Sequence, residues 1–306
     1  MERLGFACVS NVLDVKTQIL VASIRQFAGL LSDSPIWVFI PRSENRIPQK
    51  IKERFLSLDV KIIPFSINPE LRKFPFTTYV HATATAELFV KDKTELLAWL
   101  LPDTLIINTP KHFLLEKKKN LGYRPVHHTL VGSIYTESID PFWDLIYRKC
   151  NVSEEMIFPM KTHVDRNILR PYFNAGFLIV RPEKGLLQSW WECFKESYCD
   201  PSFEQFYQKD ERYSIFMHQA ILAGVILSTM KRKELQELPF SYNYPLHLYH
   251  ESPKECRPQN INELITARYE EVEWLDKVPI QEPLKNWITE QIKAFPQQSI
   301  DPSDSK

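Results

Sequence analysis

The sequence predicts an α/β fold with a mostly parallel central sheet that is flanked by helices. Two observations support this prediction. Apolar segments of strand length alternate with helical segments in the first third of the chain, and short links join them. These apolar segments are hydrophobic at consecutive positions, which is typical of strands that are buried on both faces. The 306 residues, 44% of them hydrophobic, are sufficient for such a core.

The first third of the chain contains the clearest elements. The strands expected there are residues 4–10, 36–40 and 60–65, and the helices are residues 17–32, 47–57 and 80–91. Two further buried strands flank residues 101–104, where Pro102 interrupts the apolar sequence because proline cannot lie in a central strand. Asp103 therefore lies at the carboxyl end of a buried strand, where open α/β sheets bind their ligands. The alternative is that Asp103 serves only the local turn.

The rest of the chain is less regular. Asp140 and Pro141 suit the N-cap and the first position of a helix. The other elements expected here are strands at residues 129–135, 172–182 and 246–251 and helices at residues 183–198, 214–230, 261–269 and 282–294. Because no repeat or linker is recognisable, we expect one domain over residues 1–295 and a polar, disordered tail over residues 296–306.

Composition and missing motifs argue against several classes of protein. The chain has 38 Lys and Arg against 38 Asp and Glu, so it has no overall attraction to nucleic acid or anionic lipid. It has no GxGxxG and no GxxxxGK[ST] pattern, which argues against a dinucleotide site and a P-loop. Its five cysteines are scattered without a CxxC pair, which favours reduced thiols. With no basic-then-apolar leader and no apolar segment near about 20 residues, we expect a cytoplasmic protein without a transmembrane segment.

Four pieces of the chain occur in a recognisable order. They are a strand-helix-strand unit from residue 4, Leu-Leu-Ala-Trp-Leu-Leu-Pro-Asp-Thr-Leu-Ile-Ile-Asn-Thr-Pro at 96–110, Phe-Asn-Ala-Gly-Phe-Leu-Ile-Val at 173–180, and His-Gln-Ala-Ile-Leu at 218–222 ahead of Leu-Pro-Phe-Ser-Tyr-Asn at 238–243. This order resembles the nucleotide-diphospho-sugar transferases of GT-A fold, especially the glycogenin-like and lipopolysaccharide-galactosyltransferase-like branch (family eight). The resemblance spans roughly residues 4–250. It implies a single Rossmann-like GT-A domain with a C-terminal helical extension.

The resemblance also implies an activity and a cofactor. A sugar would be transferred from a UDP- or GDP-sugar to an acceptor that the sequence does not identify. The family holds a divalent metal, Mn²⁺ or Mg²⁺, through a Leu-Asp-x-Asp-Thr motif, and the metal neutralises the charge that develops on the departing diphosphate. In the matching residues 100–104, Asp103 keeps the second carboxylate and Leu101 replaces the first. This degenerate DxD motif predicts weak metal binding.

The other metal ligand of the family is a late histidine. His247 and His250 are its candidates here, although a core or surface histidine is the alternative for each. If the protein functions without a metal, side-chain cations such as Arg170 or Lys254 would have to take its part.

Further positions of the resemblance mark a donor site. Asn174 and Gly176 match a Phe-Asn-Ser-Gly segment whose Asn faces the donor sugar and whose Gly allows close approach of the backbone. His218 and Gln219 occupy the place of an Asp-Gln pair near the sugar hydroxyls, with His218 as a candidate base. The structural alternatives are a strand-entry cap for Asn174 and a helix-surface histidine for His218. The residues marked for the nucleotide base and ribose are Ser10 and Asn11.

A non-catalytic binding or scaffolding protein of the same fold is the main alternative function. The first carboxylate of the motif, the Asp before Gln219 and the family's downstream Gly and Lys-Pro-Trp are all absent. The transferase and the non-catalytic protein differ in whether a further carboxylate lies together with Asp103 and a histidine in the fold. The candidates for this carboxylate are Asp14, Asp165 and Glu251. A hydrolase is disfavoured because the sequence has no GxSxG and no Cys in a strand-to-helix elbow.

Overall fold

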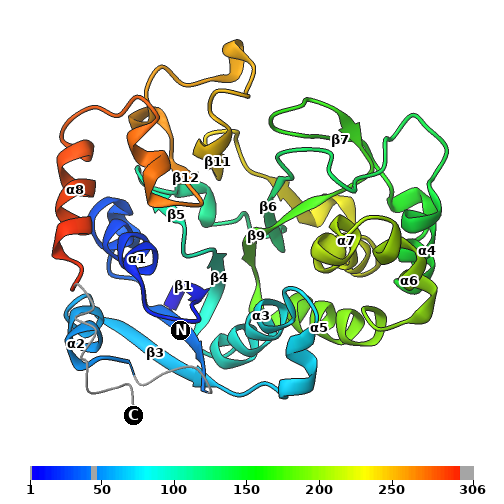
Figure 1. The fold of residues 1–306 in the computed structure, drawn as a ribbon, viewed down its shortest axis with the longest axis horizontal. Helices are drawn as coiled ribbons and strands as arrows, with labels where there is room; N and C mark the ends of the chain where they lie inside the picture. Colours follow the sequence, from blue (N-terminus) through cyan, green and yellow to red (C-terminus); the bar gives the residue numbers. More distant parts are fainter. Residues whose placement is uncertain (1, 43–46, 297–306) are drawn as a thin grey trace.

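The centre of the protein is a seven-stranded sheet with the strand order β10-β6-β9-β4-β1-β2-β3 (Figure 1). The computed structural model describes residues 2–42 and 47–296. The strands of this sheet are β1 (Glu2–Val9), β2 (Ile36–Pro41), β3 (Val60–Phe65), β4 (Thr94–Leu100), β6 (Leu121–Pro125), β9 (Phe173–Val180) and β10 (Leu235–Glu237). β9 is antiparallel to both of its neighbours, and the other pairs are parallel. The predicted mostly parallel central sheet is confirmed.

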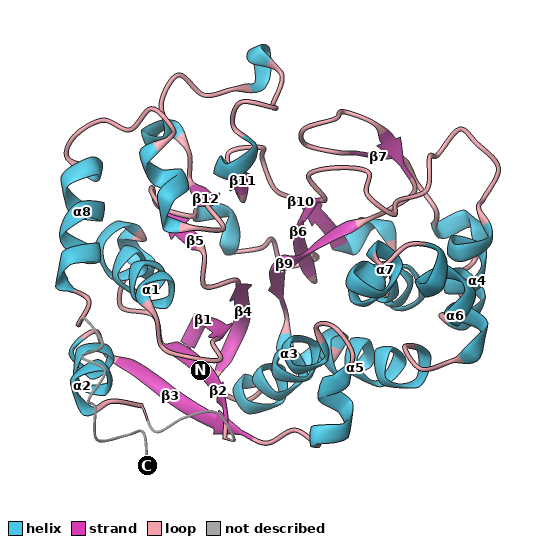
Figure 2. Cartoon of the chain, viewed as in Figure 1, coloured by secondary structure: helices cyan, strands magenta, loops and turns pink. Residues whose placement is uncertain are grey.

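Helices cover both faces of this sheet (Figure 2). They are α1 (Val15–Phe27), α2 (Gln49–Ser57), α3 (Thr77–Val90), α4 (Pro141–Lys149), α5 (Leu186–Ser197), α6 (Pro201–Lys209), α7 (Arg212–Thr229) and α8 (Leu284–Ala294). Alternate side chains of each strand enter two different cores. In β1, Phe6 and Cys8 lie in the core that contains α1 and α2, whereas Ala7 and Val9 lie in the core that contains α3, α5 and α7. Burial on both faces explains why the strands are hydrophobic at consecutive positions.

Local capping residues begin several of these helices. At the start of α1, Asp14 Oδ1 accepts a hydrogen bond of 2.8 Å from a backbone N–H of the first turn. Asp140 caps α4 in the same way and Pro141 follows it, as the sequence predicts. Asp200 and Pro201 repeat this pair at the start of α6, a helix that the sequence analysis does not predict. The same capping signal could have found it.

A second, three-stranded sheet lies beyond the carboxyl end of β4. Its strands are β5 (Thr104–Ile106), β12 (Thr266–Arg268) and β11 (Tyr244–Pro245), in the order β11-β12-β5. The break predicted at residues 101–104 is present, and it carries the chain from one sheet into the other. β12 runs antiparallel to β5, and this pairing sets Arg268 opposite Thr104. A basic residue from late in the chain therefore lies next to Asp103.

The C-terminal helical extension is formed by α8, which packs against α1. The rings of Phe27 and Trp287 meet edge to face with 4.8 Å between their centroids. Figure 1 shows α8 beside α1 at one edge of the molecule.

Two predicted strands are wrong. Residues 129–135 form a series of turns, in which Leu130 has a positive φ of 46° and only an isolated bridge is made, by Ile134. A positive φ is incompatible with extended strand geometry. Residues 246–251 begin with a 3₁₀ helix over Leu246–Leu248 instead of a strand. Neither segment pairs with the central sheet, and Val131 and Leu246 are buried without strand structure.

The helix predicted over residues 261–269 is also wrong. The segment contains a 3₁₀ turn over Ile261–Glu263 and then β12. Pairing with β5 and β11 supplies backbone hydrogen bonds that override the weak local helical preference. The strand β6 lies in a segment for which no element is predicted from the sequence.

Part of the predicted tail, residues 297–306, lies outside the described residues, and the domain boundary at residue 295 stays a prediction. Within residues 2–42 and 47–296, no helix combines the length and the apolar character that crossing a bilayer requires.

Candidate functional site

A cavity of about 810 Å³ opens at the carboxyl ends of β1 and β4. Its wall is formed by the loop after β1, the start of α1, the segment before α3, the break after β4 and one residue of β12. Ser10, Asn11 and Asp103, three of the predicted site residues, line it. The cavity lies where open α/β sheets bind their ligands.

A second cavity of about 440 Å³ adjoins the first one. Four residues line both cavities: Phe76, Tyr79, Leu101 and Arg268. The predicted site residues in the second cavity are Asn174, Gly176, His218, Gln219 and His247. The fold thus brings together side chains from the two halves of the chain in two connected hollows.

His250 is not part of this arrangement. It is exposed on the turn that follows Leu246–Leu248, and its Nε2 lies 3.2 Å from the carbonyl oxygen of Lys277. His247 does line the second cavity, where its Nε2 lies 3.3 Å from Glu270 Oε1. Burial lowers the pKa of His247 to about 4, so the ring is neutral near pH 7.

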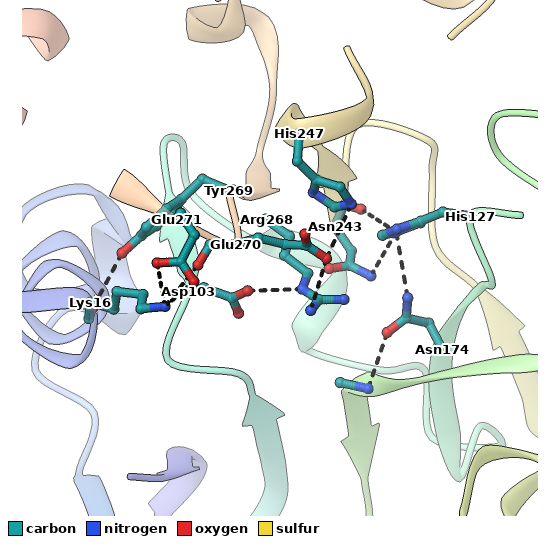
Figure 3. A network of polar contacts seen from close by, with 11 residues as sticks. Lys16, Asp103, His127, Asn174, Asn243, His247, Arg268, Tyr269, Glu270 and Glu271 are labelled. Atoms are coloured by element: carbon teal, nitrogen blue, oxygen red, sulfur yellow. Dashed lines mark hydrogen bonds and ion pairs between the residues drawn. The ribbon is translucent and has the colours of Figure 1, made fainter. Parts of the chain in front are cut away.

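Asp103 forms an ion pair with Arg268. Arg268 Nε donates to Asp103 Oδ2 at 3.0 Å, and the backbone N–H of Tyr269 donates to the carbonyl oxygen of Asp103 at 3.1 Å. Arg268 Nη2 also lies 3.5 Å from Glu270 Oε1. Figure 3 shows this chain of contacts from Asp103 through Arg268 and Glu270 to His247. Asp103 therefore does more than complete a local turn, because its side chain is joined to a strand from late in the chain.

Asn174 and Gln219 fasten the start of β9 from two sides. Asn174 Oδ1 accepts from the backbone N–H of Gly176 at 3.1 Å, and Gln219 Oε1 accepts from the backbone N–H of Ala175 at 3.0 Å. Asn174 Nδ2 lies 3.5 Å from His127 Nε2 on the opposite wall of the cavity. Asn174 thus holds the local backbone and lines the cavity at the same time.

His218 is buried rather than on the helix surface. Its ring stacks on Phe76 with 4.2 Å between centroids and an angle of 14°. Its Nδ1 donates to the carbonyl oxygen of Ile215 at 2.9 Å, which leaves Nε2 as an acceptor. Burial lowers the pKa of His218 to about 4. A neutral His218 with an available Nε2 has the form of a hydrogen-bond acceptor or base.

A sequence model of the Rhodobacterales glycosyltransferase domain matches residues 5–229. The chain belongs to this glycosyltransferase family. The match covers most of the chain and includes every predicted site residue except His247 and His250. It favours a glycosyltransferase over a non-catalytic protein of the same fold. No curated protein sequence matches the chain.

Solved structures show the same fold. The galactosyltransferase LgtC, in a complex with donor and acceptor sugar analogues, is similar with a TM-score of 0.52 and 15% identity, over 96% of each chain. The bifunctional glycosyltransferase WbbM is similar with a TM-score of 0.52 and 12% identity, over 96% of this chain and 52% of that one. At sequence identities this low, the similarity to these structures shows a shared fold and nothing more. This fold agrees with the GT-A architecture expected from the sequence.

The residues of this glycosyltransferase do not fit the divalent metal that the fold family implies. Leu101 supplies no ligand atom, and Arg268 already occupies one oxygen of Asp103. Across the part of the chain that the structure describes, no group of three or more His, Cys, Asp or Glu side chains could hold a metal ion. The additional carboxylates considered from the sequence do not join Asp103: Asp14 caps α1, and Asp165 and Glu251 lie near His128.

Gly176 has a structural role that the resemblance does not imply. A Cβ atom at this position would lie 2.3 Å from Leu101 Cδ1 and 2.9 Å from Leu101 Cγ. Leu101 N donates to the carbonyl oxygen of Gly176 at 3.1 Å, so the two backbones are adjacent. Gly176 is therefore needed to make room for Leu101.

Several residues of the site were not found from the sequence. Arg268 falls in the segment where the sequence predicts a helix, and His127 is not among the predicted site residues. Phe76 is 45% exposed at the junction of the two cavities and adopts a positive φ of 60°, which nothing in the local sequence indicates. The cations proposed from the sequence lie elsewhere: Arg170 is bound to Ser133 Oγ at 3.0 Å, and neither Arg170 nor Lys254 lines the two cavities.

Proposed function

We propose that this glycosyltransferase takes a sugar from a nucleoside-diphosphate sugar, with the nucleotide in the first cavity and the sugar in the second. The observation that carries this proposal is the junction of the two cavities. Ser10, Asn11 and Asp103 line one side of it, and Asn174 and Gln219 line the other. A donor that spans the junction would have its diphosphate beside Arg268.

The lining of the first cavity contains more basic than acidic side chains. Four basic side chains line it against two carboxylates; they are Lys16, Arg72, Lys73 and Arg268, against Asp14 and Asp103. In the transfer, the bond between the sugar's anomeric carbon and the diphosphate oxygen breaks, and its electron pair stays on the diphosphate. A new bond forms to an acceptor oxygen, whose proton is released. Basic groups near the diphosphate favour this charge movement.

Thermal unfolding with UDP and with GDP tests the donor. Ligand at about 100 times its dissociation constant stabilises the folded protein by about 2.7 kcal/mol, which raises the midpoint by a few degrees. Asn11→Trp should abolish the shift, because the exposed Asn11 side chain lines the first cavity and a bulky ring would fill it. The matched control is His250→Trp, which places the same ring on an exposed residue outside both cavities.

Two results would contradict the proposal. One is the absence of a shift with either nucleotide in the wild-type protein. The other is a shift that survives in Asn11→Trp, which would mean that the nucleotide binds elsewhere.

The proposal includes one domain over residues 1–295 and a cytoplasmic location. The packing of α8 on α1 supports the first part, and the five free cysteines are consistent with the second. Limited proteolysis that releases α8 as a separate stable fragment would contradict the single domain.

A further inference from the structure

Arg268 lies at the junction of the two cavities and lines both of them. Its side chain is 24% exposed, so the guanidinium is held by protein atoms and still reachable from the cavities. Nε is bound to Asp103 and Nη2 faces Glu270, whereas Nη1 has no hydrogen-bond partner among the residues that the structure describes. The guanidinium therefore has N–H donors available for a ligand.

Backbone pairing places Arg268 beside Asp103, whose carboxylate holds the guanidinium. β12 pairs with β5 so that Arg268 lies opposite Thr104, and the N–H of Tyr269 donates to the carbonyl oxygen of Asp103 at 3.1 Å. The planar fork of an arginine matches the oxygen atoms of a phosphate and remains charged at all relevant pH values. A cation that is positioned before the ligand arrives needs little reorganisation on binding.

The Asp103–Arg268 pair has the same net charge as two carboxylates that hold a divalent cation, namely zero. Leu101 replaces one carboxylate of that arrangement. Glu270 Oε1, 3.5 Å from Arg268 Nη2, adds one negative charge beside the pair. A divalent cation added at Asp103 would lie beside the Arg268 guanidinium, which is 3.0 Å from Oδ2, and the two positive charges would repel each other.

We propose that Arg268 takes the place of the divalent metal: held by Asp103, it binds and neutralises the diphosphate of the donor, so that donor binding needs no metal. The proposal rests on the proposed function, because it concerns the nucleotide of the first cavity. Arg268 stabilises the charge that the departing diphosphate receives when the anomeric carbon–oxygen bond breaks. It takes no part in the transfer of the acceptor proton.

Calorimetric titration with UDP and with GDP tests this proposal, in buffer with EDTA and in buffer with Mn²⁺. The wild-type dissociation constant should agree within about twofold in the two buffers. Arg268→Ala should weaken binding by about tenfold to hundredfold in both, because it loses a charge-assisted hydrogen bond. The control is Arg212→Ala, which removes an arginine from a surface Arg–Asp pair with Asp210, outside both cavities, and should leave binding unchanged.

A double variant separates direct contact from charge compensation. If Arg268 only cancels the charge of Asp103, Asp103→Ala/Arg268→Ala should bind like wild type, and that result would overturn the proposal. If Arg268 contacts the diphosphate, the double variant should stay at least about tenfold weaker. Arg268→Lys keeps the positive charge and can be measured if Arg268→Ala fails to fold. In EDTA this variant should bind the nucleotide more weakly than wild type does, and Mn²⁺ should not restore its binding.

The outcomes also separate the two proposals. Wild-type binding that is lost in EDTA and restored by Mn²⁺ would overturn the role of Arg268 and leave the proposed donor intact. No binding of either nucleotide in any buffer would refute both.

Discussion

Gly176→Ala is expected to destabilise the protein through its contact with Leu101. The new methyl group would lie 2.3 Å from Leu101 Cδ1, whereas ordinary carbon contacts are at about 3.5–4.0 Å. The leucine or the strand β9 must then move by more than about 1 Å. Overpacking of this kind costs about 1–3 kcal/mol. For a chain of this length, each kcal/mol lowers the unfolding midpoint by about 2 °C.

A double-mutant cycle measures whether Leu101 is the cause. Thermal unfolding followed by circular dichroism would compare wild type, Gly176→Ala, Leu101→Ala and the double variant. In the Leu101→Ala background the cost of Gly176→Ala should fall by at least about 1 kcal/mol, because the clashing atoms are gone. Leu88→Ala, which truncates an exposed leucine of α3, is the control and should leave the cost of Gly176→Ala unchanged.

The reasoning would be refuted if Gly176→Ala cost the same in both backgrounds. That result would mean that the glycine is needed for the backbone or for a ligand, as the family resemblance implies, and not to make room for Leu101.

Three further predictions concern buried polar groups. Burial raises the pKa of Glu87 from 4.5 to about 7, so the folded protein binds an extra proton between these two pH values. The free energy of unfolding therefore falls by about 3 kcal/mol as the pH rises through this range. When denaturation at pH 5 and pH 8 is compared, Glu87→Gln should remove most of this loss, and the exposed Glu95→Gln should not. The Tyr79 hydroxyl accepts a hydrogen bond from Trp99 Nε1 at 2.6 Å and donates one to the Ala175 carbonyl at 2.8 Å. Tyr79→Phe should therefore lower the free energy of unfolding by about 2–3 kcal/mol. An unchanged midpoint of thermal unfolding would contradict these bonds. His218 should titrate near pH 4 in the folded protein by NMR, so that stability is lost as the pH falls below 6.5, and a titration near 6.5 would show that the ring is solvated.

The sequence determined the first half of the central sheet because its signals are local. Each strand from β1 to β4 is a short apolar segment, and the first helix between them, α1, has both an apolar stripe and the Asp14 cap. The position of Asp103 also followed from local chemistry, since Pro102 had to end the strand before it. Capping residues would have given α6 as well, because Asp200 and Pro201 repeat the signal of α4.

The predicted site residues fell largely into the two cavities for a related reason. Ser10, Asn11 and Asp103 follow β1 and β4, and the carboxyl ends of parallel strands meet at one edge of a sheet. Ser10 and Asn11 came from the resemblance, as did Asn174 and Gln219, and the fold brings the last two to the adjoining cavity. The sequence did not decide between His247 and His250 as the late histidine, because the segment from residue 246 lacks the strand structure that was expected there.

Tertiary structure alone decided what accompanies Asp103. Arg268 is 165 residues away in the sequence and reaches the carboxylate because β12 adds to β5 as an antiparallel strand. Neither three-residue strand has a periodicity that marks its partner, so the pairing depends on packing with α1 and α8 rather than on local preference. The sequence shows Leu101 where the resemblance implies a first carboxylate, and the tertiary structure places the Arg268 guanidinium beside Asp103.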